Sequence, residues 1–273
     1  MATKPLRIGV IGANFGAAVH IPAFQSEGLE VVAVFSRNEQ RALETAARFG
    51  IPHAFTDYRR LIDLEEMDAV AIASPARQHY EMTMAALDAG KHVLCEKPFA
   101  SNQRQAKELW QKAERSGLTT MIAHEFRFAS GRMRGRELIQ EGYLGTLHKA
   151  IISLVTGPTT GFSVRPLTER DATFEGGFLF SLGAHYIDCI RHWLGEVTAV
   201  TGQVQVLAGA RTDPATGAPV QAAADDAFHF VLELAGGGTA EMPGTNVAPF
   251  VPGGQLALYG NEGTIVTPHV GRG

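Results

Sequence analysis

Uninterrupted apolar runs alternate with helix-like segments through the first 125 residues, and this alternation restricts the fold more than any other feature of the sequence. Strands that are apolar throughout are typical of a parallel sheet covered on both faces. Alternating strands and helices build such a sheet, so the sequence predicts a doubly wound α/β domain. The predicted strands are Leu6–Ile11, Leu29–Phe35, Ala69–Ala73, His92–Leu94 and Thr119–Ala123, and the predicted helices are Ala17–Gln25, Glu39–Phe49, Tyr58–Leu64, Gln78–Ala89 and Gln103–Ser116.

The pattern changes after Arg127. In Phe228–Leu234 apolar and polar residues alternate, which indicates a strand exposed on one side, and Ala235–Gly238 joins it to the next strand like a hairpin. We therefore expect a first domain over residues 1–125 and, over residues 126–273, an α+β domain around a largely antiparallel open sheet. Its predicted strands are His148–Thr156, Val197–Leu207, Ala227–Leu234, Thr239–Asn246, Gln255–Tyr259 and Thr264–Thr267, its helices are Arg132–Glu141 and Gly183–Leu194, and Ala208–Ala224 is predicted as a surface loop.

Charge and cysteine content exclude several classes of protein. The net charge of -4 over 273 residues gives no electrostatic reason to bind nucleic acid or an anionic membrane. No stretch approaches the roughly 20 apolar residues of a membrane-spanning helix. The two cysteines, Cys95 and Cys189, cannot build a disulfide framework. We therefore expect a cytoplasmic protein.

The first predicted strand runs into Gly12-Ala-Asn-Phe-Gly16-Ala17 ahead of a helix. A Rossmann domain places a tight glycine turn here, so that the pyrophosphate of a dinucleotide meets free N–H groups at the positive end of the helix. Asn14 stands where the second glycine is usual, and asparagine tolerates positive φ better than most residues. The turn predicts a nucleotide site. On these residues alone, a plain glycine turn in another α/β protein stays open.

The second predicted strand ends in Phe35-Ser36-Arg37, about 20 residues after the glycine turn. An acidic residue at this place binds the ribose hydroxyls of NAD, whereas a hydroxyl beside a guanidinium suits the 2′-phosphate of NADP. Arg41 lies about one helical turn further on and can add a second positive charge. The pattern favours NADP over NAD. The alternative is that Arg37 is a solvated surface arginine.

Further motifs carry a family resemblance. The third strand continues as Ala71-Ile-Ala-Ser74-Pro75 with His79 behind it, and the fourth lies in Gly90-Lys-His-Val-Leu-Cys-Glu-Lys-Pro98. The second domain contains Gly176-Gly-Phe-Leu-Phe-Ser-Leu-Gly-Ala-His-Tyr-Ile-Asp188. With the glycine turn, these strings resemble the glucose–fructose oxidoreductase/inositol dehydrogenase (Gfo/Idh/MocA) family from about residue 6 to about residue 267. The string from Gly90 to Pro98 is the most specific part.

The resemblance implies an NAD(P)-dependent dehydrogenase or reductase that acts on CH–OH groups of sugars, polyols or related small alcohols and ketones. It implies that Lys97 lies beside the nicotinamide and the reacting hydroxyl, and that His185 reaches the same carbon from the second domain. It also implies a homodimer or homotetramer formed through the open sheet. The residues expected to line the cofactor groove are Gly12, Asn14, Phe15, Gly16, Ser36, Arg37, Ser74, Pro75, His79, Glu96, Lys97 and Arg127.

Two departures from the family pattern bear on substrate and length. The family commonly has an acidic residue four positions before the histidine, and here that position is Ser181, which cannot carry a negative charge. Either the substrate differs from the inositol or glucose type, or another group such as Asp188 takes the role, so Ser181 and Asp188 are both candidates for catalytic support. The chain also stops at Gly273, where family members continue for several dozen residues, and we expect a C-terminally truncated second domain.

The expected chemistry is proton exchange with the substrate oxygen as hydride moves. A lysine such as Lys97 can exchange that proton where burial or a neighbouring positive charge lowers its pKa. Histidine titrates near neutral pH, so His185 can act as base, acid or orienting group, and a purely structural histidine is the alternative. The rival functions are a nucleotide-sensing protein without turnover and redox-neutral, glycoside-type chemistry with a tightly held NAD.

The last two predictions concern metal binding and the substrate loop. The side chains His185, Asp188, Cys189 and His192 would share one face of a helix, as zinc ligands do, but the family motif already explains the first of them and we expect no metal. The loop Gly157–Glu175 is expected to shape the substrate pocket, because loops commonly set specificity. Its candidate residues are Phe162, Arg165, Arg170 and Phe174.

Overall fold

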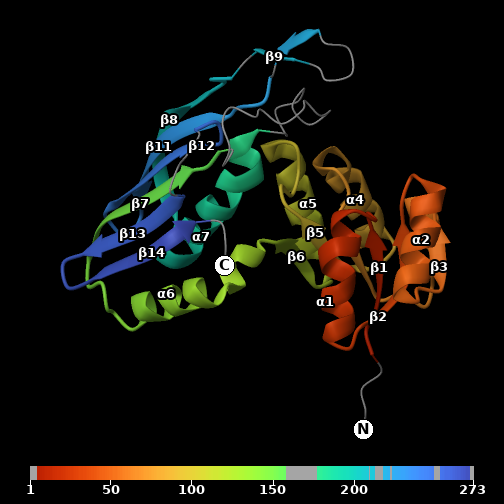
Figure 1. The fold of residues 1–273 in the computed structure, drawn as a ribbon. Coiled ribbons are helices and arrows are strands. Elements are labelled where there is room, and N and C mark those ends of the chain that lie inside the picture. The colour runs from red at the N-terminus through yellow and green to blue at the C-terminus, as the bar shows by residue number, and fades with distance from the viewer. Residues whose placement is uncertain are drawn as a thin grey trace. The chain divides into compact units, whose positions relative to one another are not determined.

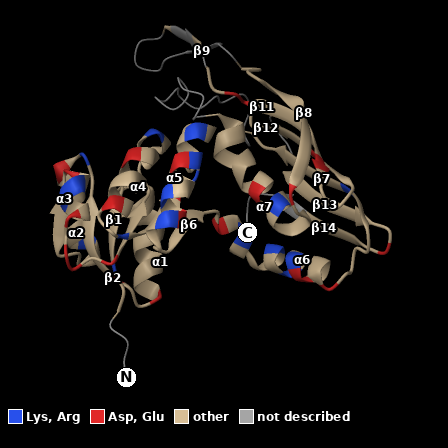
Figure 2. Cartoon of the chain, turned by 180° about the vertical axis from the view of Figure 1, so that it is seen from behind, with Lys and Arg blue, Asp and Glu red and all other residues tan. Residues whose placement is uncertain are grey.

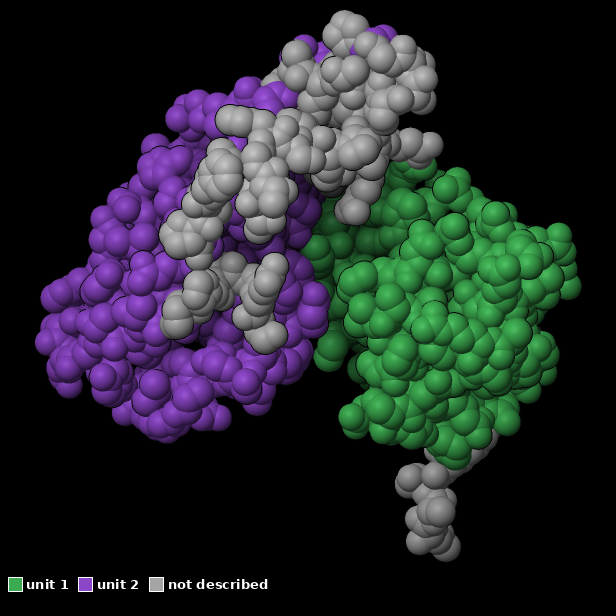
Figure 3. Space-filling view, viewed as in Figure 1, with its two compact units in different colours: residues 1–123 green, residues 124–273 purple. Residues whose placement is uncertain are grey.

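The computed structural model of the chain describes residues 5–157, 177–208, 210–212, 218–221, 223–248 and 253–270 (Figure 1). The chain divides into two compact units, Met1–Ala123 and His124–Gly273 (Figure 3). Each unit has its own six-stranded sheet and its own buried apolar side chains. The four candidate residues of the predicted substrate loop, from Phe162 to Phe174, lie outside the described residues.

The sheet of the first unit has the strand order β3-β2-β1-β4-β5-β6, and every pair of neighbours is parallel. This order confirms the predicted doubly wound fold, with the chain turning from one half of the sheet to the other between β1 and β4. Strand β3 has no counterpart among the predicted strands, because three residues are too few for a periodic pattern. The strands are β1 (Arg7–Ile11), β2 (Glu30–Phe35), β3 (His53–Phe55), β4 (Ala69–Ile72), β5 (His92–Glu96) and β6 (Thr120–Ala123).

Helices cover both faces of this sheet. Residues of η1, α1 and α2, among them Ala17 and Ile21, join one apolar core, and residues of α3 and α4, among them Leu61 and Met82, join the other. The first predicted helix begins as a π-helical turn, so the single α-helix expected over Ala17–Gln25 is wrong in its first part. The helical elements are η1 (Gly16–His20), α1 (Ile21–Ser26), α2 (Glu39–Phe49), α3 (Tyr58–Ile62), α4 (His79–Asp88) and α5 (Gln103–Ser116).

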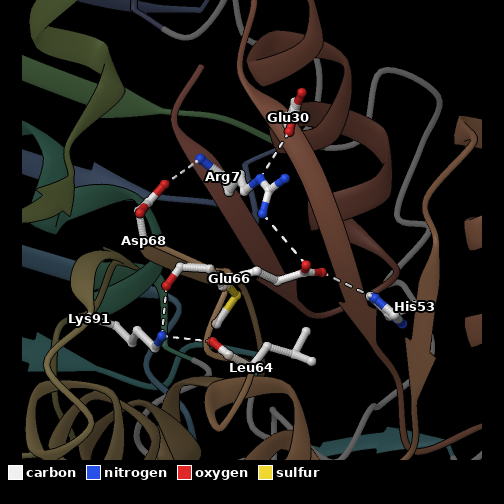
Figure 4. Close-up of polar contacts among 8 residues, drawn as sticks. Arg7, Glu30, His53, Leu64, Glu66, Asp68 and Lys91 are labelled. Atoms are coloured by element: carbon white, nitrogen blue, oxygen red, sulfur yellow. Dashed lines mark hydrogen bonds and ion pairs between the residues drawn. The ribbon is translucent and has the colours of Figure 1, made fainter. Parts of the chain in front are cut away.

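A polar network lies at the amino ends of these strands (Figure 4). Lys91, which precedes β5, is 9% exposed, and its Nζ donates to the carbonyls of Leu64 at 2.7 Å and Met67 at 2.6 Å. A buried ammonium needs such partners, so these bonds hold the turn before β4 against β5. The other polar members of the network are Arg7, Glu30, His53, Glu66 and Asp68. Because ligands of open parallel sheets bind at the opposite, carboxyl edge, we assign this network a structural role.

The sheet of the second unit has the order β14-β13-β7-β12-β11-β8. The pair β7–β12 is parallel and the other pairs are antiparallel, which confirms the largely antiparallel sheet, and Ala235–Gly238 joins β11 to β12 as a hairpin. The strands are β7 (Leu147–Val155), β8 (Val197–Gln205), β11 (Ala227–Leu234), β12 (Thr239–Thr245), β13 (Gly254–Gly260) and β14 (Thr264–Val270), and the longer helices are α6 (Ser130–Gln140) and α7 (Ala184–Leu194).

One face of this second sheet is covered and the other is open. Helix α7 buries Tyr186, Ile190 and Trp193 in a cluster with strand residues such as Ile152. Fully burying a side chain of this size stabilises the fold by roughly 1.5–3 kcal/mol. Along β12 every second residue is buried, as expected when one face is solvated. Strand β8 carries no charged side chain (Figure 2). Its Val200 is 65% exposed and pairs with the buried Leu232 of β11.

The predicted surface loop Ala208–Ala224 contains two short strands, β9 (Ala210–Thr212) and β10 (Pro219–Gln221), which pair antiparallel. The prediction of a loop is wrong at these residues. Each strand has only three residues, too few to show an alternating pattern. Proline usually indicates a loop, but it is tolerated at the first position of a strand, where Pro219 lies in β10. Among the described residues, no helix combines the length and the apolar character that crossing a bilayer requires.

Candidate nucleotide and catalytic site

The glycine turn after β1 is shaped by one close backbone approach. Gly12 has a φ of 124°, and a Cβ placed on it would lie 2.4 Å from the carbonyl oxygen of Ala73 at the end of β4. Its N–H donates to the Phe35 carbonyl at 3.0 Å, which ties the turn to the end of β2. The position therefore accepts only glycine, and the turn lies where three parallel strands end.

The π-helical turn η1 follows directly and packs closely on β1. A Cβ on Gly16 would lie 2.7 Å from Cγ1 of Val10, and Ala17 is buried beside it. Small residues at both positions let the first helical turn approach the strand, as the third glycine position of a dinucleotide turn requires. Phe15, at the tip of the turn, is 43% exposed.

A cavity of about 190 Å³ opens at this carboxyl edge. Six of the twelve residues expected to line the cofactor groove line this cavity, and they come from three separate segments of the chain. These six are Gly12, Asn14, Ser36, Arg37, Ser74 and Pro75, and the other lining residues are Ala13, Phe35, Asn38, Arg41, Ala73 and Gln78. Ser74 Oγ is buried and has no hydrogen-bond partner among the described residues, which leaves an unmet hydrogen bond beside the cavity. These features fit a dinucleotide.

The basic corner of the cavity is preorganised by two asparagines. Arg41 Nη1 donates to Oδ1 of Asn14 at 2.9 Å, so the residue in the second glycine position holds this guanidinium in place. Asn38 caps helix α2 by accepting from the N–H of Arg41 at 2.9 Å, and its own N–H donates to Oγ of Ser36 at 3.2 Å. Arg37 is exposed at the same edge.

His79 supports the groove and does not offer a ring nitrogen to it. The side chain is 1% exposed, Nδ1 lies 2.8 Å from the carbonyl of Pro98, and Nε2 lies 2.8 Å from the carbonyl of Ser74. Both nitrogens face backbone oxygens, so a direct hydrogen bond to a cofactor is not what this geometry provides. The ring of His79 therefore joins two loops, and its place among the residues of the cofactor groove stays a prediction.

Lys97 follows β5 and is half-buried, and the Lys97–Pro98 peptide is cis. The preceding carboxylate is engaged on both oxygens: Oε1 of Glu96 lies 2.8 Å from Nε2 of His20, and Oε2 accepts from the N–H of Lys97 at 3.2 Å. His20 and Glu96 are both 8% exposed. The buried Glu96 carboxyl group therefore has one histidine partner and one backbone partner.

His185 is the second residue of α7, which directly follows the π-helical turn η5 (Leu179–Gly183). Its side chain is buried, and the residue is 2% exposed. Its ring stacks on Phe126 with centroids 4.0 Å apart and an interplanar angle of 15°, and it meets His124 edge-on at 5.6 Å. Nε2 lies 3.8 Å from Oε1 of Glu125. The short helix η3 (Glu125–Phe128) thus supplies an aromatic face and a carboxylate to this histidine.

Asp188 forms an ion pair with Arg127. Nε of Arg127 donates to Oδ2 at 2.6 Å and Nη2 donates to Oδ1, a two-point contact. These hydrogen bonds raise the pKa of Arg127 above its usual value. His124 Nε2 lies 4.0 Å from the same carboxylate. Ser181 lies in η5 and its hydroxyl donates to the carbonyl of Phe178 at 3.3 Å. The carboxylate of Asp188, a candidate for catalytic support, is therefore hydrogen-bonded to Arg127.

The described residues contain no group of three or more histidine, cysteine, aspartate or glutamate side chains placed to hold a metal ion. The two cysteines are 1% exposed, and burial raises the pKa of Cys95 to about 12 and that of Cys189 to about 11. Both thiols therefore stay protonated near neutral pH.

Three contacts of this site lay outside the sequence predictions. The pair His20–Glu96 joins residues 76 positions apart, Asn38 was not singled out as a cap, and Phe126 was not identified as the stacking partner of His185. Only Asn38 had a sequence signal, because asparagine directly before a helix is a common N-cap.

Comparison with known proteins identifies relatives over nearly the whole chain. Residues 6–124 match the oxidoreductase family model with an NAD-binding Rossmann fold, and residues 133–266 match the GFO/IDH/MocA C-terminal domain. An uncharacterized oxidoreductase of Synechocystis sp. is 31% identical over 268 residues, which cover 96% of this chain and 71% of the relative. Levoglucosan dehydrogenase of Pseudarthrobacter phenanthrenivorans is 29% identical (71% and 53% covered), and an NADP(+)-dependent D-xylose 1-dehydrogenase of Haloferax volcanii is 33% identical (70% and 58% covered).

Solved structures agree with these relatives. The crystal structure of an NAD binding oxidoreductase from Klebsiella pneumoniae superposes with a TM-score of 0.89 at 29% identity, covering 97% of this chain and 73% of that one. A levoglucosan dehydrogenase in complex with NADH gives a TM-score of 0.87 at 25% identity, covering 97% of this chain and 73% of that one. The chain thus spans between about half and three quarters of the length of the proteins it matches.

Proposed function

We propose, from the premise that this chain belongs to the Gfo/Idh/MocA family of oxidoreductases, that it transfers a hydride between a nicotinamide dinucleotide and a sugar, polyol or related small alcohol or ketone. The observation that carries the proposal is the close approach of Gly12 to the Ala73 carbonyl beside the cavity at the carboxyl edge. This arrangement leaves backbone N–H groups and open space at the carboxyl edge of the sheet, where open parallel sheets bind dinucleotides.

The preferred cofactor in this proposal is NADP. Ser36, Arg37 and Arg41 offer a hydroxyl and two guanidinium groups at the end of β2, and none of the described residues that line the cavity is acidic. A 2′-phosphate is bound by such groups, whereas the free ribose hydroxyls of NAD are bound by a carboxylate. Two relatives are named as NADP(+) enzymes, while the solved levoglucosan dehydrogenase complex contains NADH.

When bound, the nicotinamide supplies the hydride acceptor or donor. In the direction of oxidation, the uncharged amine of Lys97 would take the proton from the hydroxyl oxygen as hydride leaves the carbon that bears this oxygen, and in reduction the ammonium would return that proton. His185 orients the substrate oxygen or exchanges its proton from the second unit. The N–H groups after Gly12 hold the pyrophosphate, and Phe15 and Gly16 complete that turn.

The second unit supports the site through Arg127. We infer that Asp188 acts by holding this guanidinium in one orientation, which fixes the position of the positive charge expected near the nicotinamide. Ser181 supports the position of His185 through the π-helical turn that leads into α7. This arrangement differs from an acid–histidine pair, and it favours a substrate that does not need the acidic residue usual in the family.

A fluorescence titration with NADPH and NADH tests the cofactor proposal. Wild-type protein should bind NADPH more tightly, and Arg37→Ala should raise the Kd for NADPH about 10- to 100-fold, because a charge-assisted hydrogen bond contributes roughly 1.5–3 kcal/mol. Arg48→Ala is the matched control, since Arg48 lies in the last turn of α2, the helix that follows Arg37, over the Phe49 ring. Equal loss of NADH and NADPH binding would refute the phosphate-binding role.

Turnover with a panel of alcohols tests the catalytic proposal. The panel takes levoglucosan, D-glucosides, D-xylose and scyllo-inositol from the names of the relatives. Lys97→Met should lower kcat at least about 100-fold, the usual value of an acid–base group, and Lys107→Met on the exposed face of α5 should not. NADPH binding without turnover of any compound would favour a nucleotide-sensing protein. A cofactor that co-purifies and is never released would favour redox-neutral chemistry.

We further propose that the open face of the second sheet binds a second copy of the chain. The proposal is supported by exposed apolar side chains of two neighbouring strands on this face, Tyr259 at 39% on β13 and Val266 at 47% on β14. Apolar patches of this kind mark association surfaces. Light scattering should give a dimer or tetramer, and Val266→Lys should shift it towards the monomer. A wild-type monomer would refute this assembly.

A further inference from the structure

The residues on either side of Lys97 are each hydrogen-bonded to a buried histidine from a different helical element. On one side, Nε2 of His20 lies 2.8 Å from Oε1 of Glu96, and on the other, Nδ1 of His79 lies 2.8 Å from the carbonyl of Pro98. We propose that His20 and His79 are positioning residues that fix Lys97 for proton transfer. The proposal rests on the proposed catalytic role of Lys97.

The first connection runs through a buried carboxylate. Glu96 is 8% exposed, so its charge needs partners, and its two oxygens are used by His20 and by the backbone N–H of Lys97. The imidazole is itself fixed: Phe24 stacks on it at 5.7 Å and Phe15 meets it edge-on at 5.5 Å. A displacement of this ring would therefore move the carboxylate and, with it, the backbone of Lys97.

The second connection joins two loops at the carboxyl edge. His79 begins α4, and its ring lies between the carbonyl of Ser74 after β4 and the carbonyl of Pro98 after β5, both at 2.8 Å. A neutral ring has one N–H and donates to one of these oxygens, and a ring with hydrogens on both nitrogens donates to both. Only the ring with hydrogens on both nitrogens is hydrogen-bonded to both oxygens, because in the neutral ring one acceptor nitrogen faces an acceptor oxygen.

These contacts define a positioning role rather than a catalytic one. His79 is 1% exposed and His20 is 8% exposed, and the bonded ring nitrogens of both face protein atoms. Proton transfer requires the amine of Lys97 within about 2.6–3.2 Å of the reacting oxygen. Lysine has a long flexible stem, so its reach depends on a fixed backbone, and a misplacement of about 1 Å can lower the rate roughly 100-fold.

Amide substitutions separate the two bonds of His79, because glutamine places its N–H₂ near the position of Nε2 and asparagine near that of Nδ1. His79→Asn keeps a donor towards Pro98, whereas His79→Gln keeps one towards Ser74 and loses the contact beside Lys97. We expect kcat to fall about 10- to 100-fold in His79→Gln and to stay within about threefold of wild type in His79→Asn. The Kd for NADPH should change little in both.

Substitutions of His20 test its bond to Glu96 in the same way. His20→Gln keeps a donor for Glu96 and should retain most of the turnover, whereas His20→Leu should lose about 10- to 100-fold in kcat. The matched control is His92→Gln, because His92 lies at the opposite end of β5 and its Nδ1 accepts from the N–H of Thr119 at 2.9 Å. It removes a histidine hydrogen bond from the same strand without reaching Lys97.

A readout that does not depend on turnover separates this proposal from the proposed function. The chain has six lysines, so ¹³C reductive methylation gives few NMR signals, and Lys97→Met identifies the one of interest. The pH titration of that signal should shift in His79→Gln and His20→Leu and stay unchanged in His79→Asn, His20→Gln and His92→Gln. Equal behaviour of the Asn and Gln variants, or unaltered kcat and titration in all of them below their melting temperatures, would overturn the positioning role. Loss of the Lys97→Met effect on turnover would instead overturn the proposed function.

Discussion

Replacing Gly12 by alanine tests the geometry on which the nucleotide site depends. Gly12 has a φ of 124°, and its added Cβ would lie 2.4 Å from the Ala73 oxygen and 2.7 Å from the Ala73 carbonyl carbon. Backbone held in a sparsely populated region costs about 1–3 kcal/mol. Overpacking against a backbone that cannot turn aside costs roughly another 1–3 kcal/mol. We expect Gly12→Ala to lower the free energy of unfolding by about 2–6 kcal/mol, out of about 5–15 for a typical domain.

Gly117→Ala is the control that separates these two contributions. Gly117 ends helix α5 with a φ of 68°, and nothing lies within 4 Å of its added Cβ, so only the left-handed backbone is penalised. Urea denaturation followed by circular dichroism gives both free energies, and an NADPH titration follows binding. Gly12→Ala should lose at least about 1 kcal/mol more than Gly117→Ala and should lose NADPH binding. Equal destabilisation of the two variants, or unchanged binding in Gly12→Ala, would refute the reasoning.

Three further outcomes follow from the described contacts. Lys91→Met removes two charge-assisted hydrogen bonds and should lower the free energy of unfolding by about 3 kcal/mol in urea, and a loss below about 1 kcal/mol would contradict the structural role of Lys91. Burial raises the pKa of Cys95 to about 12 and that of Cys189 to about 11, so a thiol reagent at neutral pH should label both only after unfolding, and rapid labelling of the native protein would contradict this. Asp188→Asn removes the charge that holds Arg127 and should destabilise the second unit by about 1–3 kcal/mol in thermal denaturation, with an unchanged melting temperature as the contrary result.

The fold of the first unit is largely predictable because its strands and helices are long enough to show a pattern. The parallel order follows from uniformly apolar strands separated by helices, and the structure confirms it. Three-residue strands such as His53–Phe55 are missed by the sequence prediction, because no period can be recognised over so short a segment. The π-helical turn η1 is also missed, since its pattern of apolar residues resembles that of an α-helix.

The candidate site divides in a similar way. Residues whose role follows from local geometry, such as Gly12 in a tight turn, can be proposed from the sequence. Pairs that depend on the folded chain cannot: His20 meets Glu96 across 76 positions, and Arg127 meets Asp188 across 61. The sequence offers Asp188 as a candidate for catalytic support, and only the folded chain shows that its carboxylate binds an arginine on another element.

The two lysines of the motif from Gly90 to Pro98 show how topology separates a structural charge from one that we propose to be functional. Lys91 and Lys97 lie at opposite ends of the same strand, β5. Because all strands of this sheet are parallel, each edge gathers the same end of every strand. At the amino edge Lys91 meets backbone carbonyls and is buried, whereas at the carboxyl edge Lys97 stays half-buried at the edge that also carries the glycine turn. Of the two, only Lys97 lies at the edge where open parallel sheets bind dinucleotides, so we propose the proton-exchanging role for it and a stabilising role for Lys91.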